Sequence, residues 1–331
     1  MAFVSIRDLK VAFDGTRVLH GIDLDIGRGE AVGLVGESGC GKSVTWLAAL
    51  GLLPARASVT GSVRLDGQEL VGAPRQALES VRGKRIAMIF QDPSSSLNQV
   101  QRVGRQIMES LTLHRGLRGA VARAEAIRLM DMVGIPSAAT RVDLYPHEFS
   151  GGQCQRIMIA MALAGEPDLL VADEPTTALD VSVQAQMLQL LKDLHRETGA
   201  AMMLITHDLG VVAKMADRVA VFYAGRIVEC APTPQLFAAP RHPYTAGLLA
   251  ATPAPDAEGR MRVTAIPGAM PGIGALPSGC AFHPRCPRAT EICRQVVPTL
   301  DAGAVACHHP LPVPGGGQPA DRPADPPGGQ P

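Results

Sequence analysis

The stretch of sequence that decides the fold is Gly36-Glu37-Ser38-Gly39-Cys40-Gly41-Lys42-Ser43. It matches the pattern G-x-x-x-x-G-K-S/T, in which the backbone N–H groups of a glycine-rich loop surround nucleotide phosphates. The apolar run Ala31–Val35 before it predicts a buried strand, and Ser43–Leu52 after it predicts a helix. A phosphate-binding loop requires a strand, this loop and a helix in that order, so a surface turn with a chance lysine is a poor alternative.

We expect this loop to bind MgATP through its backbone and two side chains. The loop amides and the positive end of the following helix suit the β-phosphate. Lys42 is expected to reach the β- and γ-phosphates, and the Ser43 hydroxyl to ligate Mg²⁺. Cys40 occupies a variable position of the pattern, where a helix N-terminus could lower its thiol pKa. A small packing residue is the favoured interpretation there, ahead of a redox role.

Two adjacent carboxylates follow another apolar run. Leu169–Ala172 predicts a buried strand that ends in Asp173 and Glu174. We expect Asp173 to hold Mg²⁺ through water, and Glu174 to polarise the attacking water. An exposed acidic turn is the ordinary interpretation of one such carboxylate. It accounts less well for an Asp-Glu-Pro sequence downstream of a phosphate-binding loop.

The pattern outside these motifs predicts an α/β fold. Two alternating runs before residue 30, joined by the turn Asp14-Gly15, predict strands. Further buried strands are predicted at Arg85–Phe90, Met202–Thr206 and Ala220–Tyr223. Strands that alternate with helices predict a mostly parallel sheet covered on both faces. Residues 92–149 are helical in pattern and more polar, with Val121–Val133 the clearest amphipathic helix, and predict a subdomain inserted into the sheet domain.

The bulk composition limits the classes of function. The chain has 331 residues, 46% of them hydrophobic, and a formal net charge of zero, so charge gives no argument for nucleic acid as a partner. No apolar run reaches the roughly 18 residues needed to span a bilayer. The opening MAFVSIRDLK lacks the pattern of a secretory signal. We therefore expect the protein to stay in the cytosol, with any role at a membrane coming through a partner.

These motifs resemble those of the ABC transporter ATP-binding subunits. The segment Ser150-Gly151-Gly152-Gln153 is similar to the family signature, whose helix faces the nucleotide held by the other subunit. Phe13 lies where the family stacks an aromatic ring on adenine, and Ala178-Leu179-Asp180 resembles the D-loop. Gln91 resembles the glutamine that senses Mg²⁺ and couples to the permease, and His207 the histidine that contacts the γ-phosphate. The resemblance implies that Glu174, His207 and Gln91 are catalytic.

Three further segments resemble the oligopeptide and dipeptide importer branch of this family, which also contains nickel and glutathione relatives. They are Ile89–Pro93 with Ser96-Leu97-Asn98, Tyr145–Glu148, and Pro240–Thr245. The resemblance covers residues 3 to about 310 and implies an importer ATPase, a translocase that takes up peptides or another small solute. Its expected partners are a second ATPase subunit, identical or homologous, two permease subunits and an extracytoplasmic binding protein.

The cysteines of the C-terminal region form a group that the ATPase motifs do not explain. Of seven cysteines, Cys280, Cys286, Cys293 and Cys307 lie within 28 residues in a proline-rich segment poor in large apolar residues. Such a segment needs a staple, and four thiolates suit zinc or an iron–sulfur cluster. Free buried cysteines are the alternative. The segment Gly279–Pro287 also resembles the C-terminal module of peptide-importer ATPases, some of which carry a 4Fe–4S cluster, so we favour that cluster, with zinc second.

The sequence therefore predicts an α/β P-loop ATPase core with an inserted helical subdomain and a small cysteine-rich C-terminal module. We place the ATPase domain at residues 1–239, its helical subdomain at about 92–152, the module at 240–310 and a disordered Pro/Gly-rich tail at 311–331. A DNA-acting or ribosomal ABC ATPase is less favoured because residues 92–149 are too short for a long coiled coil. A redox module with a vestigial ATPase and an exporter subunit are also less favoured.

Overall fold

The central sheet of the computed structural model has six strands in the order β10-β9-β3-β8-β7-β6. These strands are β10 (Arg226–Pro232), β9 (Arg218–Tyr223), β3 (Ala31–Val35), β8 (Ala201–Thr206), β7 (Leu169–Asp173) and β6 (Ile86–Ile89). All neighbours pair in parallel except β9 and β10. The structure describes residues 2–177, 180–252, 254–255, 261–262, 264–300 and 305–313. The predicted parallel sheet is present, and β10 adds an antiparallel edge that the sequence did not predict.

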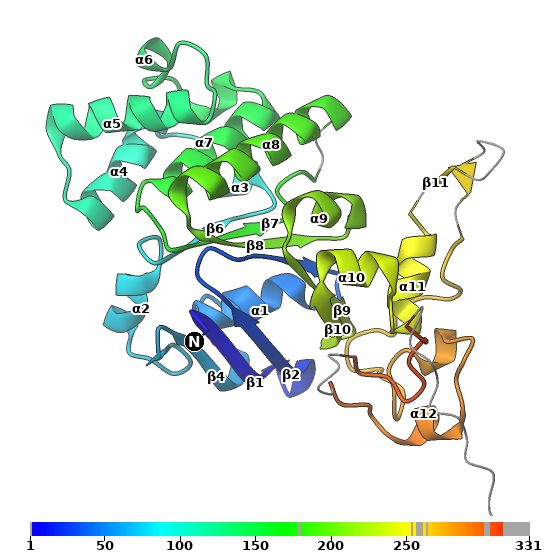
Figure 1. Cartoon of the computed structure of the whole chain (residues 1–331). Helices are drawn as coiled ribbons and strands as arrows, with labels where there is room; N and C mark the ends of the chain where they lie inside the picture. Colours follow the sequence, from blue (N-terminus) through cyan, green and yellow to red (C-terminus); the bar gives the residue numbers. More distant parts are fainter. Residues whose placement is uncertain are drawn as a thin grey trace, which may run out of the picture.

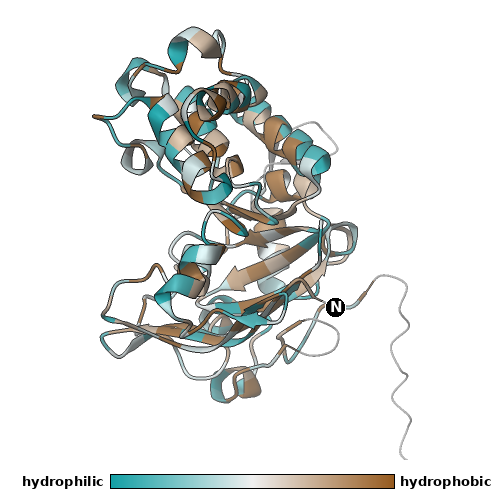
Figure 2. Cartoon of the chain, turned by 90° about the vertical axis from the view of Figure 1, so that its left-hand side faces the viewer, coloured by the Kyte–Doolittle hydropathy of each residue, from teal (hydrophilic) through white to brown (hydrophobic). Residues whose placement is uncertain are grey.

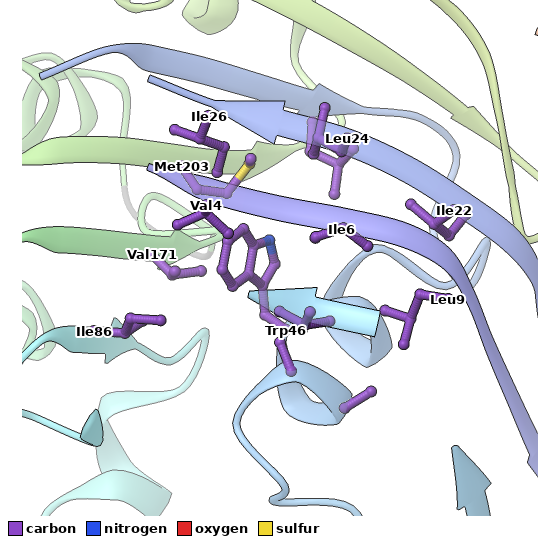
Figure 3. Close-up of a cluster of buried hydrophobic side chains, with 14 of the residues drawn as sticks. Val4, Ile6, Leu9, Ile22, Leu24, Ile26, Trp46, Ile86, Val171 and Met203 are labelled. Atoms are coloured by element: carbon purple, nitrogen blue, oxygen red, sulfur yellow. The ribbon is translucent and has the colours of Figure 1, made fainter. Parts of the chain in front are cut away.

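A second, antiparallel sheet covers one face of the central sheet. Its order is β2-β1-β4-β5, formed by β1 (Val4–Phe13), β2 (Thr16–Ile26), β4 (Ala57–Leu65) and β5 (Gln68–Glu69). The helix α1 (Lys42–Ala49) shares a core with both sheets, and its fully buried Trp46 packs among their side chains (Figure 3). The sequence predicted a central sheet covered on both faces, and on this face the cover consists of the second sheet and α1.

Helices form the other layer and a separate lobe. Short α2 (Arg75–Val81) precedes β6, and α8 (Val181–Thr198) and α9 (Leu209–Met215) follow β7 and β8. Between β6 and β7 the chain forms α3 (Pro93–Ser96), α4 (Val103–Arg115), α5 (Gly119–Met132), α6 (Ala138–Arg141), a 3₁₀ turn at Pro146–Glu148 and α7 (Gly151–Leu163). In Figure 1, α4, α5 and α6 lie at the opposite end of the molecule from β1, β2 and β4, whereas α3 and α7 lie next to the central sheet, and Figure 2 shows the two lobes from the side.

The C-terminal segment packs against β9 and β10 (Figure 1). It contains α10 (Thr233–Ala238), α11 (Pro243–Ala250), the two-residue strands β11 (Ala254–Pro255) and β12 (Met261–Arg262), a 3₁₀ turn at His283–Arg285 and α12 (Glu291–Gln295). Tyr244 and Phe282 share one buried cluster with Tyr223 of β9. A bridge between Val305 and Glu229 ties the later chain to β10. The segment therefore has a core in common with the ATPase sheet.

Two expectations from the sequence concern residues that the structure does not describe. The predicted disordered tail falls almost wholly on residues 314–331, which lie outside the described residues, as do Ala178 and Leu179 of the predicted D-loop. Within the described ranges, no helix combines the length and apolar character required to cross a membrane.

Candidate active site

The phosphate-binding loop connects the buried strand β3 to the first turn of α1, as the sequence predicts. Gly41 caps this helix at φ 110°, a left-handed conformation that favours glycine. A Cβ atom at Gly36 would lie 2.2 Å from the Phe222 carbonyl oxygen, so only glycine fits there. The Lys42 Nζ donates hydrogen bonds to the carbonyl oxygens of Gly36 (2.8 Å) and Glu37 (2.9 Å). The lysine therefore lies folded along the inside of its own loop.

The remaining loop residues divide into exposed and buried positions. Ser38 and Gly39 are exposed, whereas Cys40 is 3% exposed and packs in the core beneath the loop. Burial raises the pKa of the Cys40 thiol, and the nearby Lys42 offsets only part of that effect. The possible lowering of this pKa is therefore wrong, because desolvation outweighs the charge. The packing interpretation of Cys40 fits its surroundings.

Asp173 and Ser43 come together beneath the loop. The Asp173 carboxylate, at the end of β7, is only 6% exposed, and the Ser43 side chain lies beside it. Burial raises the pKa of Asp173, and the carboxylate of Glu174 adds to this while Ser43 and Lys42 oppose it. Its Oδ1 atom is buried without a hydrogen-bond partner among the described residues. A hydroxyl beside an orphaned carboxylate oxygen fits the oxygen ligands that Mg²⁺ takes.

Two of the residues expected to be catalytic, Gln91 and His207, lie beside the carboxylate of the third, Glu174. Glu174 Oε2 accepts hydrogen bonds from Gln91 Nε2 at 3.3 Å and from Thr177 Oγ1 at 2.8 Å. Its other oxygen lies 3.5 Å from His207 Nδ1. The Glu174 side chain is 12% exposed and its backbone has φ 47°, a strained conformation for a residue with a side chain. The Glu174 carboxylate is thus held by three side chains from separate segments.

The signature residues lie in the helical lobe. Ser150 caps α7: its Oγ accepts from the Gln153 N–H, and Gln153 Oε1 accepts from the Ser150 N–H. Ser150 and Gly151 are exposed, and Gly152 and Gln153 are partly so, which leaves the helix N-terminus open to a ligand. Asp180 caps α8 in the same manner through Val183.

Phe13 ends β1, next to Ala57 of β4, and is partly buried against the core of the two sheets. Its expected stacking on adenine stays a prediction.

Two residues that contact the loop were missed by sequence reasoning. The Glu37 backbone N–H donates to Tyr244 Oη at 3.1 Å, and Arg285 Nη1 forms an ion pair with Glu37 Oε1 at 2.8 Å. Arg285 is 248 residues from Glu37 along the chain, so no local pattern could have found it. Thr177, which supports Glu174, has no distinguishing signal in the sequence either.

The four C-terminal cysteines come together in space. All of them line one cavity of about 10 Å³, together with His242, Arg288 and others. Burial raises the pKa of the Cys280 thiol to about 11, and it also raises the pKa values of Cys286 and Cys307. Among the residues that the structure describes, no group of three or more histidine, cysteine, aspartate or glutamate side chains is arranged to hold a metal ion. The four cysteines therefore come together as expected, but the described residues do not show the expected metal centre.

Comparison with known proteins agrees with this geometry. The ABC transporter family matches residues 19–177, and the family described as "Oligopeptide/dipeptide transporter, C-terminal region" matches residues 228–293. The oligopeptide transport ATP-binding protein OppD of Salmonella typhimurium is 49% identical over 299 residues, which cover 89% of each chain. The dipeptide transport ATP-binding protein DppD of Escherichia coli is 45% identical over 321 residues, covering 94% of this chain and 98% of DppD.

Solved structures give the same fold. The ATP-binding cassette MJ0796, described as a dimeric post-hydrolysis state bound to ADP and Pi, superposes with a TM-score of 0.62 at 26% identity. It covers 70% of this chain and 98% of its own. CbiO1 of Clostridium perfringens, part of the transporter complex cbiONQ, also gives 0.62, at 28% identity over 72% of this chain and 91% of its own.

The chain is an ABC ATPase, an ATP-binding subunit of an ABC transporter. Within that class it belongs to the family of oligopeptide and dipeptide transport ATP-binding proteins, and the match extends through both the ATPase region and the C-terminal region.

Replacing Glu174 with glutamine should retain MgATP binding and remove turnover. The amide keeps the shape of the side chain but cannot accept a proton from water, and losing a general base costs about 10²–10⁴-fold in rate. The measurement is steady-state phosphate release beside nucleotide binding. Glu197→Gln, an exposed carboxylate on α8, is the matched control and should hydrolyse ATP normally. Near-normal phosphate release by Glu174→Gln would show that another group activates the water.

Proposed function

We propose that this chain binds MgATP with the loop between β3 and α1 and hydrolyses it with Glu174. In this arrangement Gly36 to Gly41 surround the phosphates, Lys42 donates to the β- and γ-phosphates, and Ser43 with Asp173 holds Mg²⁺. The observation that carries the proposal is the convergence of Gln91, Thr177 and His207 on Glu174, one residue beyond the buried Asp173. When present, the Mg²⁺ supplies positive charge to the phosphates.

The three contacts to Glu174 define how hydrolysis proceeds. The Glu174 carboxylate takes a proton from water while the water oxygen attacks the γ-phosphorus, and the bond from that phosphorus to the ADP oxygen breaks. Gln91 and Thr177 donate to Glu174 Oε2 and fix the orientation of the carboxylate. His207 is 60% exposed beside the other oxygen, so its ring is available to the γ-phosphate. The products are ADP and phosphate.

Two copies of such a chain complete the site in our proposal. ABC ATPases act as dimers, and MJ0796 is described as a dimer bound to ADP and Pi. We assign Ser150 and the α7 N-terminus to the γ-phosphate held by the partner subunit, because these groups are exposed and carry a helix dipole. Asp180 lies at the start of α8 and is assigned to the same interface. The partner is a homologous subunit or a second copy.

We propose uptake of di- and oligopeptides as the work that hydrolysis drives. The relatives are named as oligopeptide and dipeptide transport proteins, and the C-terminal region matches the corresponding family over residues 228–293. We assign residues 1–239 to the ATPase domain, with about 92–152 as its helical subdomain, and 240–310 to the importer-specific module. The expected partners are two permease subunits and an extracytoplasmic binding protein, which place this chain at the cytoplasmic face of the inner membrane.

A groove of about 580 Å³ next to Gln91 supports this partnership. It lies between the end of α1, β6 and helices of the inserted lobe, and Met158 and Met161 of α7 line it. Leu52 and Phe90, which also line it, are 42% and 38% exposed, so the groove presents two large apolar side chains to the solvent. We propose that an apolar segment of the permease occupies this groove and transmits closure at Gln91 to the membrane.

Introducing a charge into the groove should uncouple the transporter. In proteoliposomes containing both ATPase subunits, the permease and the binding protein, we expect ATP-dependent uptake of labelled peptides. Leu52→Glu should abolish that uptake and the peptide-stimulated ATPase, with MgATP binding retained, because a buried carboxylate opposes docking. Leu113→Glu, on an exposed apolar residue of α4 outside the groove, is the matched control. Uptake of nickel or glutathione instead of peptides by the intact complex would contradict the proposed cargo.

We further propose that Cys280, Cys286, Cys293 and Cys307 bind one metal centre, a 4Fe–4S cluster, with zinc as the second candidate. Four thiols from three separate stretches line one cavity, and thiolates are the ligands that both centres take. His283, His308 and His309 also line the cavity, but each has another hydrogen-bond partner through its ring. Four thiols are chemically suitable ligands for either metal centre. The centre would cross-link, and so stabilise, a segment with few large apolar residues.

Metal loading of this site should become tighter as the pH rises. The pKa of Cys280 is raised to about 11 and that of Cys286 is raised too, so these thiols carry protons at neutral pH and must release them on binding. We expect proton release in titrations of anaerobic apoprotein with iron and sulfide or with zinc. Brown protein containing iron indicates the cluster, and colourless protein with about one zinc per chain indicates zinc. Cys286→Ser should lose the metal, whereas Cys230→Ser on β10 should keep it.

Two results together would refute the metal proposal without affecting the ATP site. Anaerobically purified protein would contain neither iron nor zinc, and a quadruple Cys→Ser variant would still support transport.

A further inference from the structure

Glu37, the second residue of the phosphate loop, is held from outside the ATPase motifs. Its N–H donates to Tyr244 Oη at 3.1 Å, and its carboxylate pairs with Arg285 at 2.8 Å. Its carbonyl oxygen accepts from the Lys42 ammonium group at 2.9 Å. One residue thus connects the nucleotide-binding lysine to two side chains of the C-terminal segment.

Arg285 is buried and makes several contacts, so it can hold Glu37 in place. Its side chain is 6% exposed, and its Nε donates to the Pro267 carbonyl oxygen at 2.9 Å. Its guanidinium group also donates to Tyr223 Oη at 3.4 Å. A charge this deeply buried needs a counter-charge, and Glu37 is the carboxylate with which it forms an ion pair. The ion pair compensates the buried charge of Arg285, and it also restricts where the Glu37 side chain can lie.

Tyr244 is placed by a second, independent set of contacts. The backbone N–H of Tyr244 donates to the ring nitrogen Nδ1 of His242 at 3.0 Å. The backbone N–H of His242 in turn donates to the carboxylate of Glu229 on β10 at 2.9 Å. The Tyr244 ring is fully buried and packs on Tyr223 and Phe282, with ring centroids 4.6 and 5.4 Å away. The hydroxyl that accepts from the loop therefore belongs to a residue whose backbone and ring are both in contact with other parts of the fold.

Chain neighbours of both supports line the cysteine cavity. Arg285 lies between Cys280 and Cys286 in the chain, and His242 lines the cavity directly. The cysteine segment is thus remote from the ATP motifs in sequence but adjacent to the phosphate loop in space.

We propose that Arg285 and Tyr244 are positioning residues that hold Glu37, and with it the phosphate loop, in the conformation that binds MgATP. The C-terminal segment is then a structural part of the ATP site in addition to any role in assembly. This inference rests on the proposed ATP site, and it requires no metal at the cysteines.

The test is the MgATP affinity of the full-length chain, measured by calorimetry. Tyr244→Phe removes one hydroxyl and should weaken binding about fivefold, the effect of losing one neutral hydrogen bond. Arg285→Met should weaken it about tenfold or more, because a charged pair is broken. Arg285→Lys should recover part of the loss, since the charge is restored without the guanidinium geometry. Arg294→Met, an exposed arginine of the same segment, is the matched control and should bind as the wild type does.

A double-mutant cycle separates positioning from general loss of structure. If Arg285 acts through Glu37, the Glu37→Gln/Arg285→Met variant should bind MgATP no more weakly than the weaker single variant. The kcat of folded Tyr244→Phe and Arg285→Lys at saturating ATP should stay within about twofold of wild type, because the loss is in binding. Should Arg285→Met fail to fold, Tyr244→Phe and Arg285→Lys decide the question.

Two results would overturn the inference. One is wild-type affinity in folded Tyr244→Phe, Arg285→Met and Arg285→Lys, and the other is additive losses in the double-mutant cycle. Failure of the wild-type chain itself to bind MgATP is a different result, which would refute the proposed ATP site.

Discussion

The Lys42 ammonium group bonds to the carbonyl oxygens of Gly36 and Glu37, and these hydrogen bonds keep the phosphate loop wrapped around its own lysine. The rest of the fold serves this arrangement. The buried strand β3 delivers the loop, α1 begins at Lys42, and the close approach of Phe222 permits only glycine at the loop start. The lysine cation therefore lies within the loop that we propose surrounds the phosphates.

The carboxylate that we propose as the catalytic base depends on a second constraint, the strained backbone of Glu174. A φ of 47° costs free energy for a residue with a side chain, on the order of 1–3 kcal/mol. The Glu174 N–H donates to the Ile205 carbonyl oxygen of β8, which fixes the turn against the sheet. This conformation turns Glu174 toward Gln91, Thr177 and His207, while Asp173 stays buried below. Two neighbouring carboxylates therefore face different environments and suit different tasks.

Much of this arrangement could be predicted from the sequence because its signals are local. The loop pattern, the Asp-Glu pair after an apolar run and the strands β3, β7, β8 and β9 each depend on a few consecutive residues.

The first two strands of the antiparallel sheet were predicted, but the addition of β4 to them could not be predicted in the same way, since β4 pairs with β1 across more than forty residues. The pKa direction of Cys40 was also missed, because the degree of burial is a property of packing. Arg285 and Tyr244 reach Glu37 only through the tertiary fold, at separations of 248 and 207 residues. The C-terminal cysteines were predicted to come together and do so around one cavity, but the residues that connect their segment to the loop carry no motif.

The central claim is that this loop binds MgATP through Lys42. Equilibrium calorimetry of the full-length chain with MgATP, comparing wild type with Lys42→Ala, tests it most directly. The account predicts binding by the wild type and an affinity about 10- to 100-fold weaker in the variant, the loss expected when charged hydrogen bonds to phosphate are removed. An unchanged MgATP affinity in correctly folded Lys42→Ala would contradict it.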